Sequence, residues 1–384
     1  MKSVKTLPSL FLVIAASACN QISEPPSVTG RLISRSCEYL VGAQADDGGW
    51  HSATHGLMSS GQATTPFVLH ALLSAPDSVC VFPQEARDAA VRFIRNRVAD
   101  TGALGVFDPD ILDFPNYATA YAVMSLARIG DQDDRQLIHR MADYLVAQQI
   151  DENRGAGYEH PAYGGWGFGE TVFPLGSFGH VDLSHTRRVI QAIRASGHSN
   201  EETYRQALAY LRVHQKDPSD PRVQRVLGDS AGAAFDGGFF ASASVPVVNK
   251  STLVAINGDI ALFSSYASAT ADGLLALLAA GQDRSEPSVA AAYRWLEEHA
   301  DFSYPQGIPT DHPARWGEVM FFYHLMVRGE AYRAMEAEGQ WRDAIISLIA
   351  DKQREDGSFS NPHGAPNKED DPLLATAMVL IALG

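Results

Sequence analysis

The 384-residue chain contains 30 Lys and Arg against 45 Asp and Glu, a formal net charge of −15, and 45% of its residues are hydrophobic. A chain this acidic is not expected to bind nucleic acid, and a free polyphosphate would need a strong local cation site. The hydrophobic fraction supports a large core, and the length suits one closed barrel or toroid. Three cysteines, Cys19, Cys37 and Cys80, are too few for a disulfide scaffold or a thiolate metal cage.

The first residues have the pattern of an export signal. Lys2 and Lys5 precede an apolar stretch over 7–16, and small residues lead up to Cys19. A cysteine after small residues resembles a bacterial lipobox, although Ala16 stands where Leu is usual. An ordinary secretory signal with a coincidental cysteine is the alternative.

We therefore expect a signal peptide over 1–18, a lipid on Cys19 and a tether rich in Ser and Pro over 19–30. The lipid would anchor the protein in the cell envelope. Because Asn20 is not the Asp-type signal for inner-membrane retention, we expect the outer membrane, facing the periplasm. No later apolar run approaches the ~20 residues needed to cross a bilayer.

The rest of the chain repeats a pair of helices. One class of helix ends in a Gln followed by a Gly-rich aromatic turn, as in Gln44, Gly48 and Trp50. The pattern recurs after Gln149, Gln215 and Gln353. The second class is rich in Ala, Leu and Thr, and we expect its six members over 64–74, 116–129, 184–196, 265–280, 316–328 and 372–383.

The two classes differ in polarity. Helices such as 201–214 and 288–299 mix charges with an apolar stripe, which indicates one wet face. The stretch 373–383 is apolar on nearly every side and should be buried all round. The alternation predicts an all-α, single-domain (α/α)6 toroid over 31–384, with inner and outer helix rings. An open solenoid would need polar capping helices, and neither terminal hairpin resembles one.

The repeat also resembles a known family. The spacing Gln44-x3-Gly48-x-Trp50 resembles the QW repeat of squalene-hopene cyclases. Other strings are similar to bacterial proteins with prenyltransferase and squalene-oxidase repeats, which share the terpenoid cyclase and protein prenyltransferase toroid: 116–120, 163–167, 182–186 and 236–239. The resemblance covers roughly residues 34–384 and implies the fold, because the Gln and the aromatic ring would clamp outer helices together and carry no chemistry.

In such a toroid the starts of the inner helices surround one mouth of a central cavity, and their positive N-termini face it. The catalytic candidates there are Asp182, His185, Asp370 and Asp371. The ligand-binding candidates are Asn116, Tyr117, Trp166, Tyr266, Tyr323 and His324. We expect most of these side chains to converge at the mouth. Helix capping by Asn and Asp is the alternative explanation, and it accounts less well for the histidines and tyrosines.

Three short motifs could carry chemistry. Squalene-type cyclases resemble one another in an Asp-x-Asp-Asp run that protonates an alkene. Here 131–134 follows an inner helix and should be a solvated turn, whereas 368–371 begins with Lys368, a cation that opposes a neutral acid. His180, Asp182 and His185 have the spacing of a metal cluster, but this signal is weak in isolation. We expect no metal and no cofactor.

The leading hypothesis is a lipid-anchored envelope protein that binds a lipophilic or glycan-like ligand in its cavity. A terpene cyclase-like isomerase is the first alternative. The second is a polysaccharide-active α/α-barrel enzyme that uses carboxylates or Tyr and His in acid–base roles. We also expect a disulfide between Cys37 and Cys80, because both lie near the starts of consecutive outer helices and export permits oxidation.

Overall fold

The computed structural model describes residues 27–108, 112–169, 178–198 and 200–384. The predicted signal peptide, Cys19 and most of the tether lie outside the described residues. The first helix already begins at Val28, where the hydroxyl of Ser27 accepts a hydrogen bond from the backbone N–H of Gly30. In the part of the chain that the structure describes, no helix combines the length and apolarity needed to cross a membrane.

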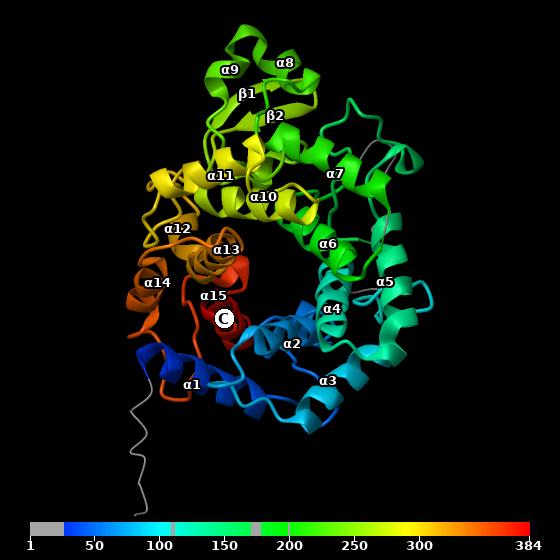
Figure 1. The fold of residues 1–384 in the computed structure, drawn as a ribbon, viewed down its shortest axis with the longest axis vertical. Helices are drawn as coiled ribbons and strands as arrows, with labels where there is room; N and C mark the ends of the chain where they lie inside the picture. Colours follow the sequence, from blue (N-terminus) through cyan, green and yellow to red (C-terminus); the bar gives the residue numbers. More distant parts are fainter. Residues whose placement is uncertain (1–26, 109–111, 170–177, 199) are drawn as a thin grey trace, which may run out of the picture.

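The helices form two concentric rings (Figure 1). The outer ring consists of α1 (Val28–Gly42), α3 (Gln84–Arg95), α5 (Arg135–Ala147), α7 (Glu201–His214), α11 (Pro287–Glu298) and α14 (Trp341–Ile349). The inner ring consists of α2 (Thr64–Ser74), α4 (Pro115–Ile129), α6 (Leu183–Ala195), α10 (Ala267–Ala279), α13 (Phe321–Ala334) and α15 (Pro372–Leu383). Each inner helix packs against the next, and α15 packs against α2. The inner ring is closed, which confirms the predicted (α/α)6 toroid and excludes an open solenoid.

Burial explains why the two classes of helix separate. Every residue of α15 from Leu373 to Leu383 is buried, as its apolar sequence predicts. The outer helix α3 instead buries Ala90, Val91, Phe93 and Ile94 and leaves its charged residues toward solvent. A helix with one apolar stripe can cover a core on one side only, so it belongs to the outer ring.

The repeated glutamines clamp neighbouring outer helices together. The side-chain amide of Gln44 donates to the carbonyl oxygens of Gly48, in its own turn, and Ala86, in the first turn of α3. Gln149 and Gln215 make the same pair of contacts around the ring. The indole N–H groups of Trp50 and Trp166 donate to carbonyl oxygens of the preceding outer helices. The QW-like repeat is therefore a structural clamp.

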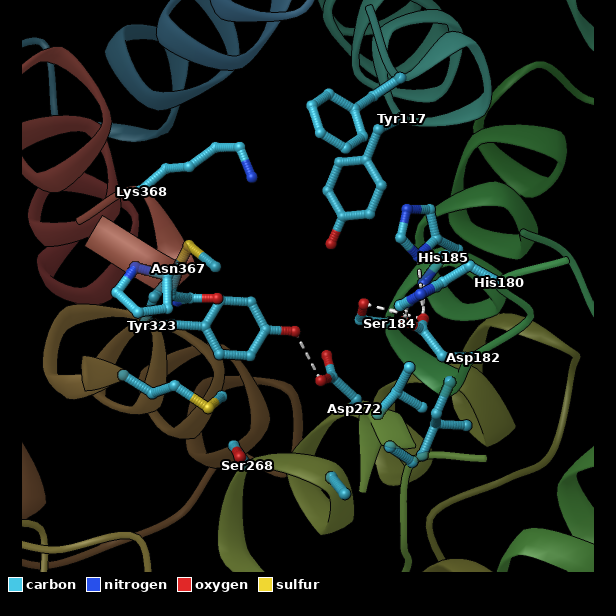
Figure 2. Close-up of a pocket in the computed structure, with 18 of the residues that line it drawn as sticks. Tyr117, His180, Asp182, Ser184, His185, Ser268, Asp272, Tyr323, Asn367 and Lys368 are labelled. Carbon is cyan, nitrogen blue, oxygen red and sulfur yellow. Dashed lines mark hydrogen bonds and ion pairs between the residues drawn. The ribbon is translucent and has the colours of Figure 1, made fainter. Parts of the chain in front are cut away.

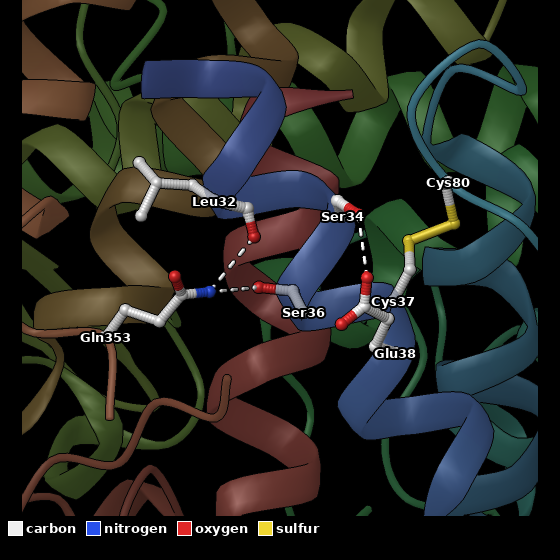
Figure 3. The surroundings of a disulfide bond; sticks show 7 residues. All are labelled: Leu32, Ser34, Ser36, Cys37, Glu38, Cys80 and Gln353. Carbon is white, nitrogen blue, oxygen red and sulfur yellow. Dashed lines mark hydrogen bonds between the residues drawn. A yellow bond between two sulfur atoms is a disulfide. The ribbon is translucent and has the colours of Figure 1, made fainter. Parts of the chain in front are cut away.

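The last clamp closes the outer ring. Gln353, in the turn after α14, donates to the carbonyl oxygens of Gly357 and, on α1, Leu32, and also to the hydroxyl of Ser36 (Figure 3). The same helix α1 is tied on its other side to the segment before α3, because the sulfurs of Cys37 and Cys80 are bonded. This is the pair that the sequence analysis expects, although Cys37 lies in the second half of α1 and not near its start. Helix α1 is thus held from both directions along the ring.

Two regions depart from the simple repeat. Between α7 and α10 the chain inserts α8 (Pro221–Leu227), α9 (Ala231–Ala234) and an antiparallel hairpin of β1 (Leu253–Asn257) and β2 (Ile260–Phe263), which project from the ring (Figure 1). The fifth inner element begins as α12 (Trp316–Val319) before α13, and it continues to Ala334, beyond the predicted end at 328. Arg328 lies within α13 and is buried, and the carbonyl oxygens of His299 and Leu296 accept from its guanidinium.

Short 3-10 turns complete the described chain. They are η1 (Gly56–Met58), η2 (Gln132–Asp134), η3 (Glu152–Arg154), η4 (Gly228–Ser230), η5 (Pro246–Val248) and η6 (Ala365–Asn367). The Asp-x-Asp-Asp letters of 131–134 fall on η2, after α4, where Arg95 pairs with Asp131 and Asp134. This segment is a turn after an inner helix, as predicted, but it is not fully solvated, because Asp134 is buried. It does not reach the cavity described below.

Candidate functional site

A cavity of about 520 Å³ lies inside the ring, toward the end where the inner helices begin. Every inner helix contributes a side chain to its wall: Phe67, Tyr117, His185, Asp272, Tyr323 and Met378. Most of the remaining wall is apolar or aromatic: Met58, Phe114, Tyr121, Phe168, Leu183, Val247, Val248, Trp316, Met320, Met326 and Leu374. The polar groups gather mainly on two patches, one at the start of α6 and one between α10 and α13, with Lys368 on another side (Figure 2).

The first polar patch is built around Asp182, which caps the N-terminus of α6. Its Oδ1 accepts from the backbone N–H of His185 and from the hydroxyl of Ser184, and lies 2.9 Å from the ring Nδ1 of His185. Its Oδ2 lies 2.6 Å from the Nε2 of His180. Burial raises the pKa of Asp182, but the two histidines outweigh burial and hold this pKa well below its usual range. Asp182 is therefore a carboxylate that orients two imidazoles.

Aromatic rings fix the two imidazoles in place. Phe168 stacks on His180 with ring centroids 4.4 Å apart, and Tyr117 meets His185 edge-on at 4.6 Å. The His185 side chain is mostly buried, whereas that of His180 is 30% exposed. Both line the cavity, so a ligand there would meet them directly.

The second polar patch pairs α10 with α13. The hydroxyl of Tyr323 donates to Oδ2 of Asp272 over 2.7 Å, and Arg187 donates to Oδ1 over 2.9 Å. Burial raises the pKa of Asp272, with Arg187 and Tyr323 acting in the opposite direction. Behind the cavity wall, Arg187 and Arg188 share the carboxylate of Glu330. This buried ion network holds Asp272 and Tyr323 rigidly against the cavity.

Two lysines also line the cavity, and the sequence analysis proposes neither as a ligand group. Lys250 comes from the insertion, donates to the carbonyl oxygen of Val248 and lies 5.1 Å from the ring centroid of Trp316. Lys368 lies 5.0 Å from the ring centroid of Phe114. Burial lowers the pKa of each, and nearby carboxylates oppose this. The helix repeat gives no signal for Lys250, because the insertion has no counterpart in other hairpins.

Glu369 supports the loop that carries Lys368 to the cavity. Its buried carboxylate accepts from the backbone N–H groups of Phe322 and Tyr323 at the start of α13, and from the amides of Asn361 and Asn367. Burial raises the pKa of Glu369 to about 7, although all four donors lower it. The residue is missed by sequence reasoning because its partners come from three separate segments.

The structure brings five of the predicted site residues together in the cavity wall. These are Tyr117, Asp182, His185, Tyr266 and Tyr323. It also adds Asp272, and it adds His180, which the sequence analysis names as part of the His–Asp–His spacing. The predicted convergence is therefore correct for side chains that lie on the cavity-facing side of an inner helix.

The expected convergence of Asp370 and Asp371 with these groups is wrong. Asp371 caps α15, accepting from the backbone N–H of Leu373 and from the hydroxyl of Ser52. Asp370 lies 2.8 Å from the Nε2 of His55. Neither residue lines the cavity. Both precede the first turn of α15 and point toward the loop before α2, Asp371 as the cap of α15 and Asp370 as the partner of His55.

Three further predicted ligand residues lie behind the wall. Asn116 donates to the carbonyl oxygen of Gly167, and the indole of Trp166 donates to the carbonyl oxygen of Leu145, so both are structural. His324 is buried in α13, and burial holds its pKa well below the usual range. It follows Tyr323 by one residue, which rotates it about 100° around the helix and away from the cavity.

The chain resembles known proteins through its fold. No protein-family model matches it, and no curated protein does either. Solved structures do match. The type II terpene cyclase MstE from Scytonema, as a variant in complex with geranylgeranyl dihydroxybenzoate, is 16% identical with a TM-score of 0.56, over 93% of this chain and 96% of that one.

Two other matches have comparable scores. A protein from Actinoplanes is 18% identical, with a TM-score of 0.52 over 92% of this chain and 98% of that one. An inactive variant of the α-1,6-mannanase GH76A of Salegentibacter sp. HEL1_6, in complex with α-1,6-mannotriose, is 8% identical, with a TM-score of 0.53 over the same shares. These likenesses show the fold. Identities this low assign no reaction.

Proposed function

We propose that this chain is an exported, lipid-anchored protein of the bacterial envelope that binds a lipophilic ligand with a polar head in its central cavity. This proposal rests on the cavity wall, which is apolar and aromatic except for two polar patches and two lysines. Its volume of about 520 Å³ falls in the range of roughly 300–1,000 Å³ that small-molecule pockets occupy. The apolar wall would bury the hydrocarbon, and the patches would orient the head.

The same wall favours a lipophilic ligand over a glycan. A sugar presents hydroxyl groups on every side, and each hydroxyl buried without a partner costs free energy. Methionines and phenylalanines such as Met320, Met378 and Phe67 offer no such partners. Both ligand classes occur among the structural neighbours, a geranylgeranyl compound in one and a mannotriose in another. The apolar character of the wall supports the lipophilic class.

The proposed lipid on Cys19 would keep the cavity close to a membrane, where lipophilic molecules partition. Replacing Cys19 by Ala should release the protein into the soluble periplasmic fraction. Unchanged membrane fractionation of this variant would refute the anchor, and it would leave the cavity proposal standing.

Ligand binding can be tested with defined probes. Purified protein should show bound lipid by native mass spectrometry, and calorimetric titration should detect farnesol and not α-1,6-mannotriose. Ala269→Phe and Met378→Trp fill the cavity without touching its polar groups and should abolish farnesol binding. His51→Ala, on a side chain that does not line the cavity, is the matched control. Binding of mannotriose alone, or farnesol binding that survives both filling variants, would refute the proposal.

A terpene cyclase-like isomerase is the second candidate, and Asp272 is the observation that favours it. A buried carboxyl with a raised pKa faces an aromatic cavity, as protonation of an alkene would need. Against this, Arg187 favours the ionised carboxylate. An isomerisation returns the proton it takes up, so incubation with geranylgeraniol should yield a product of the same mass and a different retention time. Asp272→Asn should abolish that product, and its absence with the unaltered protein would exclude this candidate for that substrate.

A further inference from the structure

His180, Asp182 and His185 form a cluster that the proposed ligand binding does not explain. One nitrogen from each imidazole and one carboxylate oxygen all lie within 4.8 Å of one another. The spacing in the sequence leaves open whether the three side chains meet. The structure brings them together on the cavity wall, at the start of α6 (Figure 2).

The donor set matches the chemistry of one class of ion. Zinc is bound by imidazole nitrogen at about 2.0–2.1 Å and by carboxylate oxygen at about 2.0–2.2 Å, and reactive zinc sites use three protein ligands plus one open position. Two imidazoles and a carboxylate supply these three ligands. Calcium and magnesium prefer oxygen ligands throughout, so they fit this cluster less well.

We propose that His180, Asp182 and His185 bind a divalent transition-metal ion, with Zn²⁺ the best match, and leave its remaining position open to the cavity. Asp182 is held for this role by the backbone N–H of His185 and the hydroxyl of Ser184. Such outer contacts orient a metal ligand and support affinity. Phe168 and Tyr117 fix the planes of the imidazoles.

Forming the site requires only a small rearrangement. Each imidazole now lies against an oxygen of Asp182, at 2.6 and 2.9 Å. A bound cation would take the place of the ring protons in these contacts. A neutral imidazole would then carry its proton on the other ring nitrogen, and a charged one would release a proton. His180 is partly exposed and can turn toward the ion.

The inference deepens the proposed function, because the open position would face the head of a ligand in the cavity. It is tested on the protein without that ligand. Full-length protein treated with EDTA should take up one Zn²⁺ per chain in a competition titration against a chromophoric chelator. Co²⁺ in the same protein should give visible absorption of the strength typical of a low-coordinate site.

The variants separate a metal site from a structural cluster. His180→Ala and His185→Ala should each weaken Zn²⁺ binding by roughly 100-fold or more, since loss of even an outer contact costs 10–100-fold. Asp182→Asn keeps the helix cap and removes the charge, with the same expected loss. His55→Ala is the control, because His55 also pairs with an aspartate, at 2.8 Å, but outside the cavity.

Less than one Zn²⁺ per chain, or binding that persists in the double variant His180→Ala/His185→Ala, would overturn the proposal. If Asp182→Asn unfolds, the partly exposed His180 decides, because its replacement leaves the cap of α6 intact. Farnesol binding without zinc binding would refute the metal site alone, and zinc binding without farnesol binding would refute the ligand alone.

Discussion

The ring-closing clamp allows a quantitative test of the toroid. Gln353→Ala removes a side-chain amide whose two N–H groups serve three acceptors, the carbonyl oxygens of Leu32 and Gly357 and the hydroxyl of Ser36. An average hydrogen bond contributes about 0.5–1.5 kcal/mol net, and a buried acceptor left without a donor adds to the loss. We expect the free energy of unfolding to fall by about 2 kcal/mol. For a domain of this size that is a Tm lower by about 3 °C.

A matched variant distinguishes the clamp that closes the outer ring from a clamp elsewhere in that ring. Gln149→Ala is the matched control, since Gln149 makes the equivalent two contacts between α5 and α7, away from the point where the ring closes. Both variants should lower the urea midpoint by similar amounts. Only Gln353→Ala should also speed amide hydrogen exchange in α1, because it removes two contacts between this helix and the turn after α14 and leaves those of Arg35. If Gln149→Ala destabilises the protein while Gln353→Ala changes neither midpoint nor exchange, the outer ring is not closed by this residue.

Three further outcomes follow from the described contacts. Because the folded-state pKa of Glu369 is raised from 4.5 to about 7, the free energy of unfolding should fall by up to about 3 kcal/mol as pH rises from about 4.5 to 7. In Glu369→Gln the urea midpoint should vary less with pH across this window. An unchanged dependence of the midpoint on pH would contradict the assignment. Replacing Cys37 and Cys80 by Ala opens a loop spanning 43 positions, and the chain-entropy relation predicts that the free energy of unfolding falls by about 4 kcal/mol. Two free thiols counted in the unaltered protein under denaturing conditions would refute the disulfide bond itself. Asp371→Ala should cost about 1 kcal/mol through the lost cap of α15 and leave farnesol binding intact, whereas a loss of binding without loss of stability would return Asp371 to the site.

Much of the fold could be predicted because burial is periodic along this chain. The bounds of α2, α7 and α15 match the ranges expected from polarity alone. The insertion that carries β1 and β2 could not be predicted in this way, since it occurs once and repeats nothing. The burial of Arg328 inside α13 could not be predicted either, since its guanidinium donates to carbonyl oxygens of α11 and of the following residue, which are distant in the sequence.

The candidate site was partly predictable for a geometric reason. Inner-helix starts meet at one end of a closed ring, so Asp182, His185 and Tyr323 could be placed there without coordinates. The direction in which each side chain points could not be predicted. Tyr323 lines the cavity, whereas His324, the next residue of α13, lies behind the wall. Lys250 was inaccessible to this reasoning, because it reaches the cavity from the insertion and not from a repeated helix.

The closed outer ring also constrains the order in which the protein can fold. Helix α1 is among the first elements made, yet the partner that completes its outer side, Gln353, lies 321 positions along the chain from Leu32. Contacts between such distant residues form slowly, since a long loop must close before they stabilise anything. Until then the bond between Cys37 and Cys80 can hold α1 beside α3. In the oxidising compartment proposed for this protein, the disulfide would keep α1 beside α3 while the remaining hairpins assemble around the ring.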